Sequence, residues 1–125
     1  MRDEKGEEMH KSKGNAIWFH EAAEEMGVDS MRWLYSRHNP ANNLMFGPNI
    51  ADEVRRMLII PLWNVYSFFV TYANIDEYDP ATKSDKNNLS ELDRWILSEL
   101  NILIGDVTDS LEKYQPERAS RNVEQ

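Results

Sequence analysis

No cysteine occurs among the 125 residues, which excludes disulfide bonds and cysteine-ligated zinc within the chain and fits a reducing compartment. The charged N-terminal segment has no apolar core, so it does not resemble a signal peptide. The longest apolar run, from Met57 to Val70, is interrupted by Asn64 and Ser67 and is judged too short to span a bilayer. These absences predict a soluble, cytoplasmic protein that is not associated with a membrane.

Basic residues are scarce relative to acidic ones. Lysine and arginine total 14 and aspartate and glutamate total 22, which gives a formal net charge of −8. A stand-alone nucleic-acid-binding protein normally presents a basic face. Any contact with RNA must therefore use a local basic patch or other parts of a larger protein.

Segments of alternating polar and apolar residues are also missing, which argues against β-strands. Apolar residues instead recur at helical spacing, and we expect Gly27 in a left-handed conformation to end the first helix, Asp29 to cap the second, and Asn39-Pro40 to stop it. The predicted fold class is all-α, a helix bundle preceded by a flexible loop. Helices are predicted over residues 18–26, 30–38, 50–75 and 90–114, with a last one opening at Pro116.

The two longest predicted helices carry the longest apolar patterns of the chain. The helix over residues 50–75 is apolar nearly all round beyond Met57, which predicts burial on several sides, and Pro61 should kink it. Ser90 and Asp93 make a capping-box start for the helix that follows a polar linker at 76–89. Its apolar residues predict a bundle seam: Leu92, Ile96, Leu100, Leu103, Val107, Leu111 and Tyr114. The four tryptophans are expected to pack in the core or between helices: Trp18, Trp33, Trp63 and Trp95.

The segment of most chemical interest is EMHKSKGN, residues 8–15. Two lysines, a serine and a glycine suit an anion such as a phosphate, because lysine carries a mobile charge and a glycine backbone can be approached closely. The P-loop pattern is absent. On composition alone, a merely solvated charged terminus explains the segment as well.

Four motifs, in order along the chain, resemble class I isoleucyl-tRNA synthetases. Residues 9–15 (MHKSKGN) resemble the KMSKS signature with its Gly-Asn continuation, and residues 27–34 (GVDSMRWL) resemble the element that follows it. Residues 62–70 (LWNVYSFFV) and 92–98 (LDRWILS) are similar to stretches of the isoleucyl enzymes. Valyl and leucyl enzymes share the loop, and the LWNVYSFF run is what favours isoleucine.

The resemblance implies ATP-dependent activation of isoleucine, with magnesium, and its transfer to tRNA. In such enzymes the signature loop closes over ATP and stabilises the charge of departing pyrophosphate. Lys11, which matches the second lysine of the signature, is the implied catalytic residue, and the implied ATP-binding residues are Met9, His10, Lys11, Ser12 and Lys13. The sequence departs from the signature at Glu8, where a lysine is usual, and at His10, where a serine is usual. Glu8 reverses a charge, which puts that lysine's contribution in doubt.

The resemblance also divides the chain into a signature loop (1–15), a connecting helical segment (16–48) and the start of an anticodon-binding helix bundle (49–125), with Arg94, Arg55 and Arg56 as candidate tRNA contacts. No HIGH motif and no editing domain occur in the sequence, and the chain end looks like a truncation. The chain alone is therefore expected to be inactive, with no bound cofactor, and its loop to be flexible while the helices from residue 50 are rigid. The alternative is a stand-alone helical module that binds a protein partner or tRNA without catalysis. No metal site is predicted, and the sequence leaves the oligomeric state open.

Overall fold

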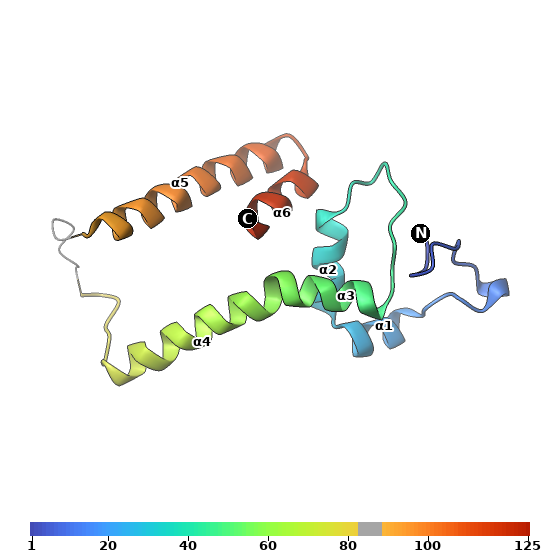
Figure 1. Cartoon of the computed structure of the whole chain (residues 1–125), viewed down its shortest axis with the longest axis horizontal. Helices are drawn as coiled ribbons and strands as arrows, with labels where there is room; N and C mark the ends of the chain where they lie inside the picture. The colour runs from blue at the N-terminus through green and yellow to red at the C-terminus, as the bar shows by residue number, and fades with distance from the viewer. Residues whose placement is uncertain (83–88) are drawn as a thin grey trace.

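A computed structural model describes residues 1–82 and 89–125. The described residues are helical or irregular apart from isolated bridges that pair Arg2 with Glu8 and Met45, which confirms the all-α fold class. The predicted linker at 76–89 falls partly on 83–88, outside the described residues. The elements are η1 (Lys11–Lys13), α1 (Phe19–Met26), α2 (Val28–Arg37), α3 (Pro48–Val54), η2 (Arg55–Ile59), α4 (Ile60–Ile75), α5 (Glu91–Glu112) and α6 (Pro116–Glu124) (Figure 1).

Two predicted helix starts are confirmed. The backbone N–H of Asp93 donates to the Ser90 hydroxyl over 3.2 Å, while the Ser90 N–H donates to the Asp93 carboxylate over 2.9 Å. These reciprocal bonds satisfy backbone donors that have no partner inside the helix, so α5 begins at Glu91. Pro116 occupies the first position of α6, where its missing N–H costs nothing.

The junction between α1 and α2 differs from its prediction. Gly27 has a positive φ of 80°, but its ψ of 137° is extended and not left-handed helical. The chain therefore turns directly into α2, which begins at Val28 with Gly27 as its N-cap, and Asp29 lies in the first turn instead of capping it. The predicted end is confirmed, since α2 stops at Arg37, ahead of Asn39-Pro40.

The hydrophobic core lies where α1, α2 and α3 meet. Its side chains come from these three helices and from Phe46 in the segment that leads into α3, and they are at most 6% exposed. Methionine and leucine at helical spacing reach a common centre there, while Ala22 and Ala51 allow the helices to approach closely. The core residues are Ala22, Met26, Met31, Leu34, Phe46, Ala51 and Val54.

The C-terminal helix α6 folds back from α5 and packs on α2 (Figure 1). The indole N–H of Trp33 donates to the Glu124 carboxylate over 2.7 Å. The same carboxylate oxygen lies 3.3 Å from the guanidinium Nε of Arg37. This contact joins residues 91 positions apart and ties the end of the chain to the N-terminal core.

The segments α3, η2 and α4 form one continuous helix over Pro48–Ile75. Its irregularity lies just ahead of Pro61, where a kink was predicted, and takes the form of a π-helical turn over Arg55–Ile59. There the Ile60 N–H donates to the Arg55 carbonyl, five residues back. Inserting one residue into the hydrogen-bond ladder is a recognised way for a helix to accommodate a local break such as proline's missing donor.

The predicted burial of the long helix beyond Met57 is wrong for this chain. Trp63 is 65% exposed and Phe68 66% exposed, and no residue of α4 is buried. The predicted seam of α5 is also largely uncovered, with Leu92 69% and Ile96 53% exposed. The physical reason is that within the described residues α4 packs closely only on its own preceding turn, while α6 packs on α5 and leaves its first half exposed.

The continuous helix Pro48–Ile75 is long and apolar enough to cross a membrane by length and composition alone. This corrects the judgement that the run from Met57 is too short, because the helix extends past both ends of that run. A single helix of this kind is weak evidence for a membrane span, since a core helix of a soluble protein has the same properties.

Candidate functional site

The signature residues form one exposed turn. Lys11–Lys13 make a 3₁₀ turn in which the Lys13 N–H donates to the His10 carbonyl over 3.1 Å. Gly14 closes the turn in the left-handed conformation, with φ 72° and ψ 9°, which glycine adopts without strain. All three residues of the turn are exposed, so their side chains are open to a ligand.

Asn15 holds the two ends of this loop together. Its side-chain oxygen accepts the His10 N–H over 2.9 Å, and its amide nitrogen donates to the Glu8 carbonyl over 3.1 Å and to the Asp3 carboxylate over 3.0 Å. The hydrogen bond from Asn15, followed by the one from the Glu7 N–H, lowers the pKa of the Asp3 carboxyl. Sequence reasoning included Asn15 only as part of the signature and missed this bridging role.

Lys11, the predicted catalytic residue, lies over an aromatic ring. Its ammonium is 4.6 Å from the centre of the Trp18 indole, a cation–π contact. Among the described residues no carboxylate lies at ion-pair distance from Lys11. Trp18 is 53% exposed and precedes α1, so its predicted role in core or inter-helix packing is wrong. Trp63 and Trp95 are also more than half exposed, and only Trp33 packs against the core.

The two residues that depart from the signature lie against each other. The His10 Nε2 is 3.3 Å from the Glu8 carboxylate, and both side chains are more than half exposed. The hydrogen bond from His10, then the positive charges of His10, Arg2 and Lys13, lower the pKa of the Glu8 carboxyl. The negative carboxylate that Glu8 introduces thus contacts His10, while the Lys11 ammonium lies over Trp18.

The residues before the signature are attached to the body of the chain. The Arg2 N–H donates to the Leu44 carbonyl over 2.8 Å, and the Phe46 N–H donates to the Arg2 carbonyl over the same distance. Because Phe46 belongs to the core, this short pairing fixes the base of the loop to the helical cluster. The Arg2 guanidinium also donates to the Gly6 carbonyl over 2.6 Å.

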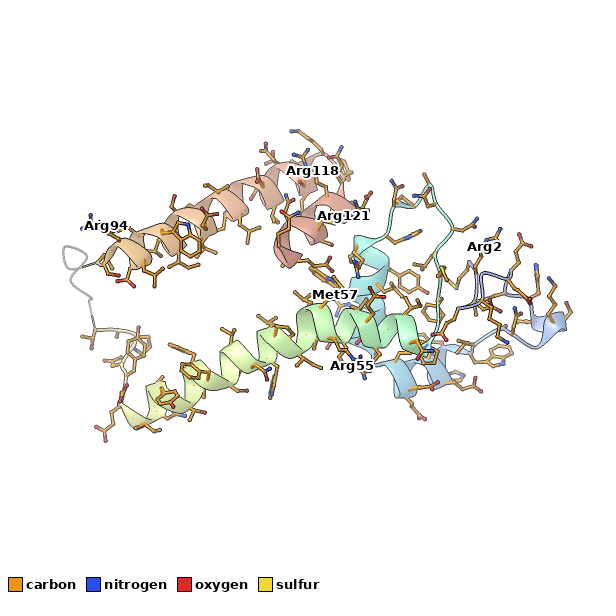
Figure 2. The ribbon with its side chains drawn as sticks, in the orientation of Figure 1. Arg2, Arg55, Met57, Arg94, Arg118 and Arg121 are labelled. Carbon is orange, nitrogen blue, oxygen red and sulfur yellow. The ribbon has the colours of Figure 1, made fainter. Side chains whose placement is uncertain are left out.

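The three predicted tRNA contacts are not brought together. Figure 2 shows Arg94 at the start of α5 and Arg55 on the distant α3–α4 helix. Arg55 donates to the Met26 carbonyl over 2.6 Å and lies 3.5 Å from Asp52, so it has a structural role between helices. Arg56 forms an ion pair with the same Asp52. Arg94 is exposed.

Within residues 1–82 and 89–125, no three His, Cys, Asp or Glu side chains gather as a metal-binding cluster. The chemistry that the loop offers is that of an anion site: two lysines, a serine hydroxyl and the backbone of a turn closed by glycine. Phosphate oxygens fit this donor set better than any metal ion does.

Comparison with known proteins yields no matching family model. It does yield many similar curated proteins, all of those described here being isoleucine–tRNA ligases. One from Dehalococcoides mccartyi is 46% identical over 123 residues, and one from Thermus thermophilus is 43% identical over 120. One from Thermococcus kodakarensis is 44% identical over 124 residues.

These alignments cover 95–98% of this chain but only 12% of each relative. The chain therefore spans about an eighth of the length of the ligases that it matches. The match covers nearly the whole chain, so it does not depend on a short motif. By sequence, the chain is similar over nearly its whole length to one segment of the isoleucine–tRNA ligases, as a fragment of such an enzyme would be.

Proposed function

We propose that this segment supplies the phosphate-binding loop of an isoleucine–tRNA ligase, which activates isoleucine with ATP and transfers it to tRNA. The observation that carries the proposal is the signature turn, in which Lys11 is exposed, free of a carboxylate partner among the described residues and adjacent to Ser12 and Lys13. A cation held only by an aromatic ring is available for a phosphate.

The relevant step is the formation of isoleucyl-adenylate. A carboxylate oxygen of isoleucine attacks the α-phosphorus of ATP, and the bond from that phosphorus to the bridging oxygen breaks. The electron pair leaves with pyrophosphate, whose negative charge grows in the transition state. The Lys11 ammonium would stabilise this charge most where it develops, which accelerates the step more than it tightens ground-state binding.

The contact between Lys11 and Trp18 supports this role energetically. An exposed cation–π contact is worth about 0.5–1 kcal/mol. A charge-assisted hydrogen bond to a phosphate oxygen is stronger. The indole can therefore hold the Lys11 ammonium when no phosphate is present, and the ammonium can still leave the indole to bind a phosphate.

Met9, His10, Ser12 and Lys13 complete the proposed ATP site, with Ser12 and Lys13 as secondary phosphate contacts. Magnesium accompanies ATP in the proposed reaction and would neutralise part of the phosphate charge. We assign it no ligand in this segment, since the loop's donors are cations and hydroxyls and not a cluster of carboxylates. The segment's own contribution is to bind phosphates.

Transfer RNA is the second proposed partner, in the cytoplasm, through the helices. Arg94 is the most suitable of the three candidate contacts because it is exposed and makes no ion pair with another described residue. Arg56 could turn outward from Asp52, whereas Arg55 would have to leave the Met26 carbonyl. The net charge of −8 implies that most of the RNA-binding energy comes from outside this segment.

A second candidate, a helical interaction module without catalysis, is favoured by one observation. The apolar side chains of α4 and α5 are exposed in the described chain, and large exposed apolar patches often mark interaction surfaces. This candidate predicts that substitutions in the signature turn have no effect on adenylate formation.

Single-turnover adenylate formation, measured in an intact ligase that carries this segment, distinguishes the two candidates. Lys11→Ala should lose on the order of 3 kcal/mol of transition-state stabilisation, or about 100-fold in rate, with a smaller change in ATP affinity. Lys13→Ala should cost less, and Glu8→Lys should be neutral or mildly activating. Lys5→Ala, which removes a lysine outside the turn, is the matched control. An unchanged rate for Lys11→Ala would contradict the proposed function.

A further inference from the structure

The carboxylate of Glu4 reaches across to the start of the long helix. One of its oxygens accepts the Asn49 N–H over 2.6 Å and the Ile50 N–H over 3.3 Å. The other accepts the Asn49 side-chain amide over 2.7 Å. The first turn of a helix has unpaired N–H groups and a partial positive charge, so an anion there is stabilised by both.

Gly47 provides the space that Glu4 occupies. A Cβ atom added at Gly47 would lie 2.3 Å from the Glu4 Cγ and 2.6 Å from its Cδ, far inside contact distance. The backbone of Gly47 is extended, with φ 169°, so any residue could adopt its conformation. Any side chain at position 47 would therefore displace Glu4 from this place, whatever the backbone freedom of the residue.

The chain itself and two further hydrogen bonds connect this contact to the signature turn. The residue before Glu4 is Asp3, whose carboxylate accepts a hydrogen bond from the Asn15 side-chain amide. Asn15 in turn accepts the His10 N–H directly before the turn that carries Lys11. The long helix and the signature turn are thus linked through Glu4, Asp3 and Asn15.

We propose that Glu4 is a positioning residue that fixes the signature loop to the N-terminus of the helix Pro48–Ile75. A displacement of that helix would move Glu4 and, through Asp3 and Asn15, the turn that presents Lys11. Its consequence for catalysis rests on the proposed function of Lys11, but the mechanical link does not.

Amide hydrogen exchange in the 125-residue chain, resolved by NMR, tests the link. In Glu4→Ala the Asn49 and Ile50 amides should exchange about fivefold faster, as expected for loss of a helix cap. The Arg2 and His10 amides should also exchange faster, although neither contacts Glu4. Gly47→Ala should produce the same pattern, because its Cβ displaces the Glu4 side chain.

Two further variants serve as controls. Glu7→Ala removes a carboxylate three residues away whose side chain makes no hydrogen bond among the described residues, and it should leave all four amides unchanged. Glu4→Gln keeps an acceptor oxygen for the helix and should give an intermediate effect. If Glu4→Ala also accelerates exchange at the core amides of Ala51 and Val54, the variant has lost its fold. The exchange rates of the Arg2 and His10 amides in Glu4→Gln then test the link instead.

The proposal is overturned if Glu4→Ala accelerates exchange only at Asn49 and Ile50, because Glu4 would then be a local cap. In an intact ligase carrying the segment, Glu4→Ala should lower the single-turnover adenylation rate several-fold and leave the KM for isoleucine unchanged. A silent Lys11→Ala with altered exchange at His10 would reject the proposed function and retain the link. Unaltered exchange at His10, together with a reduced adenylation rate in Lys11→Ala, would reject the link and retain the proposed function.

Discussion

Two regions of this chain use similar residues with opposite results. Around α1, α2 and α3, apolar side chains at helical spacing meet one another, and Met26 and Val54 are each 1% exposed. Along α4 and the first half of α5, apolar side chains at the same spacing are not covered by another helix among the described residues, and Trp63 and Phe68 remain about two-thirds exposed. Helical periodicity specifies which side chains share a face, but burial also needs a second element to cover that face.

The comparison also explains where the signature loop is held. Its attachments, at Phe46 and at the start of α3, all belong to the covered region. The loop therefore depends on the part of the chain that has its own core. The uncovered helices contribute little to the loop's position except through the continuous helix that joins α3 to α4.

The largest expected effect is in the covered region. Met26→Ala should destabilise the chain by about 2–5 kcal/mol, because it removes a fully buried side chain and leaves a cavity among α1, α2 and α3. Denaturant unfolding followed by circular dichroism measures the loss. Phe68→Ala is the matched control from the uncovered region and should change stability by less than about 0.5 kcal/mol. Equal losses for the two variants would remove the distinction between the regions.

A smaller effect is expected where α6 joins the covered region. Glu124→Ala removes the acceptor of the Trp33 indole N–H and the ion-pair partner of Arg37, both partly shielded from solvent. The cost should be about 1.5–3 kcal/mol, as for hydrogen bonds to charged groups. The NMR signal of the Trp33 indole N–H should shift towards its unfolded position. An unmoved signal would show that α6 does not depend on this contact.

The next effect is local to the uncovered region. Ser90→Ala removes the hydroxyl that accepts the Asp93 N–H, and it should cost about 1 kcal/mol of helix stability at the start of α5. The loss should be confined to the first turns, since no core transmits it. Carbon chemical shifts of residues 91–95 report the local helix content. A change that spread into α1 or α2 would show that α5 is coupled to the core more tightly than its exposure indicates.

The smallest effect is a dependence on pH at the same site. Hydrogen bonds from the Ser90 side chain and backbone lower the pKa of Asp93 below its usual value. A carboxyl with a lowered folded pKa stabilises the folded form above its unfolded pKa, near 3.9, and loses that contribution as the pH falls through the folded pKa. The first turn of α5 should therefore fray on acidification, and Asp93→Asn should remove the pH dependence. A pH profile identical in the two proteins would assign the fraying to another group.

Local features of the fold could be predicted from the sequence because they depend on neighbouring residues. The Ser90–Asp93 box, the start at Pro116 and the end of α2 before Asn39-Pro40 are of this kind. The exposure of α4 could not be predicted in the same way, because an all-round apolar pattern requires a partner helix but does not show whether the chain supplies one. The π-helical turn before Pro61 depends on how a whole helix absorbs one missing donor.

In the candidate site, too, the features set by neighbouring residues could be predicted and the long-range contacts could not. The signature residues could be found from their order along the chain, and the structure places them on one turn. The contacts of Lys11 with Trp18 and of Glu4 with Asn49 join residues seven and 45 positions apart, and no local pattern announces them. Gly47 gave no signal at all, since its importance depends on a side chain from a distant segment.

Residue-resolved hydrogen exchange on the unmodified chain tests the contrast between the two regions most directly. We expect the slowest exchange at Met26, Leu34 and Val54, in helices that share the core, and markedly faster exchange in α4 beyond Trp63 and in the first half of α5. The sequence pattern alone predicts the reverse order for these helices, with residues from 50 onward the most rigid. Equal or greater protection along α4 and the first half of α5 would contradict this expectation and show that their apolar faces are covered.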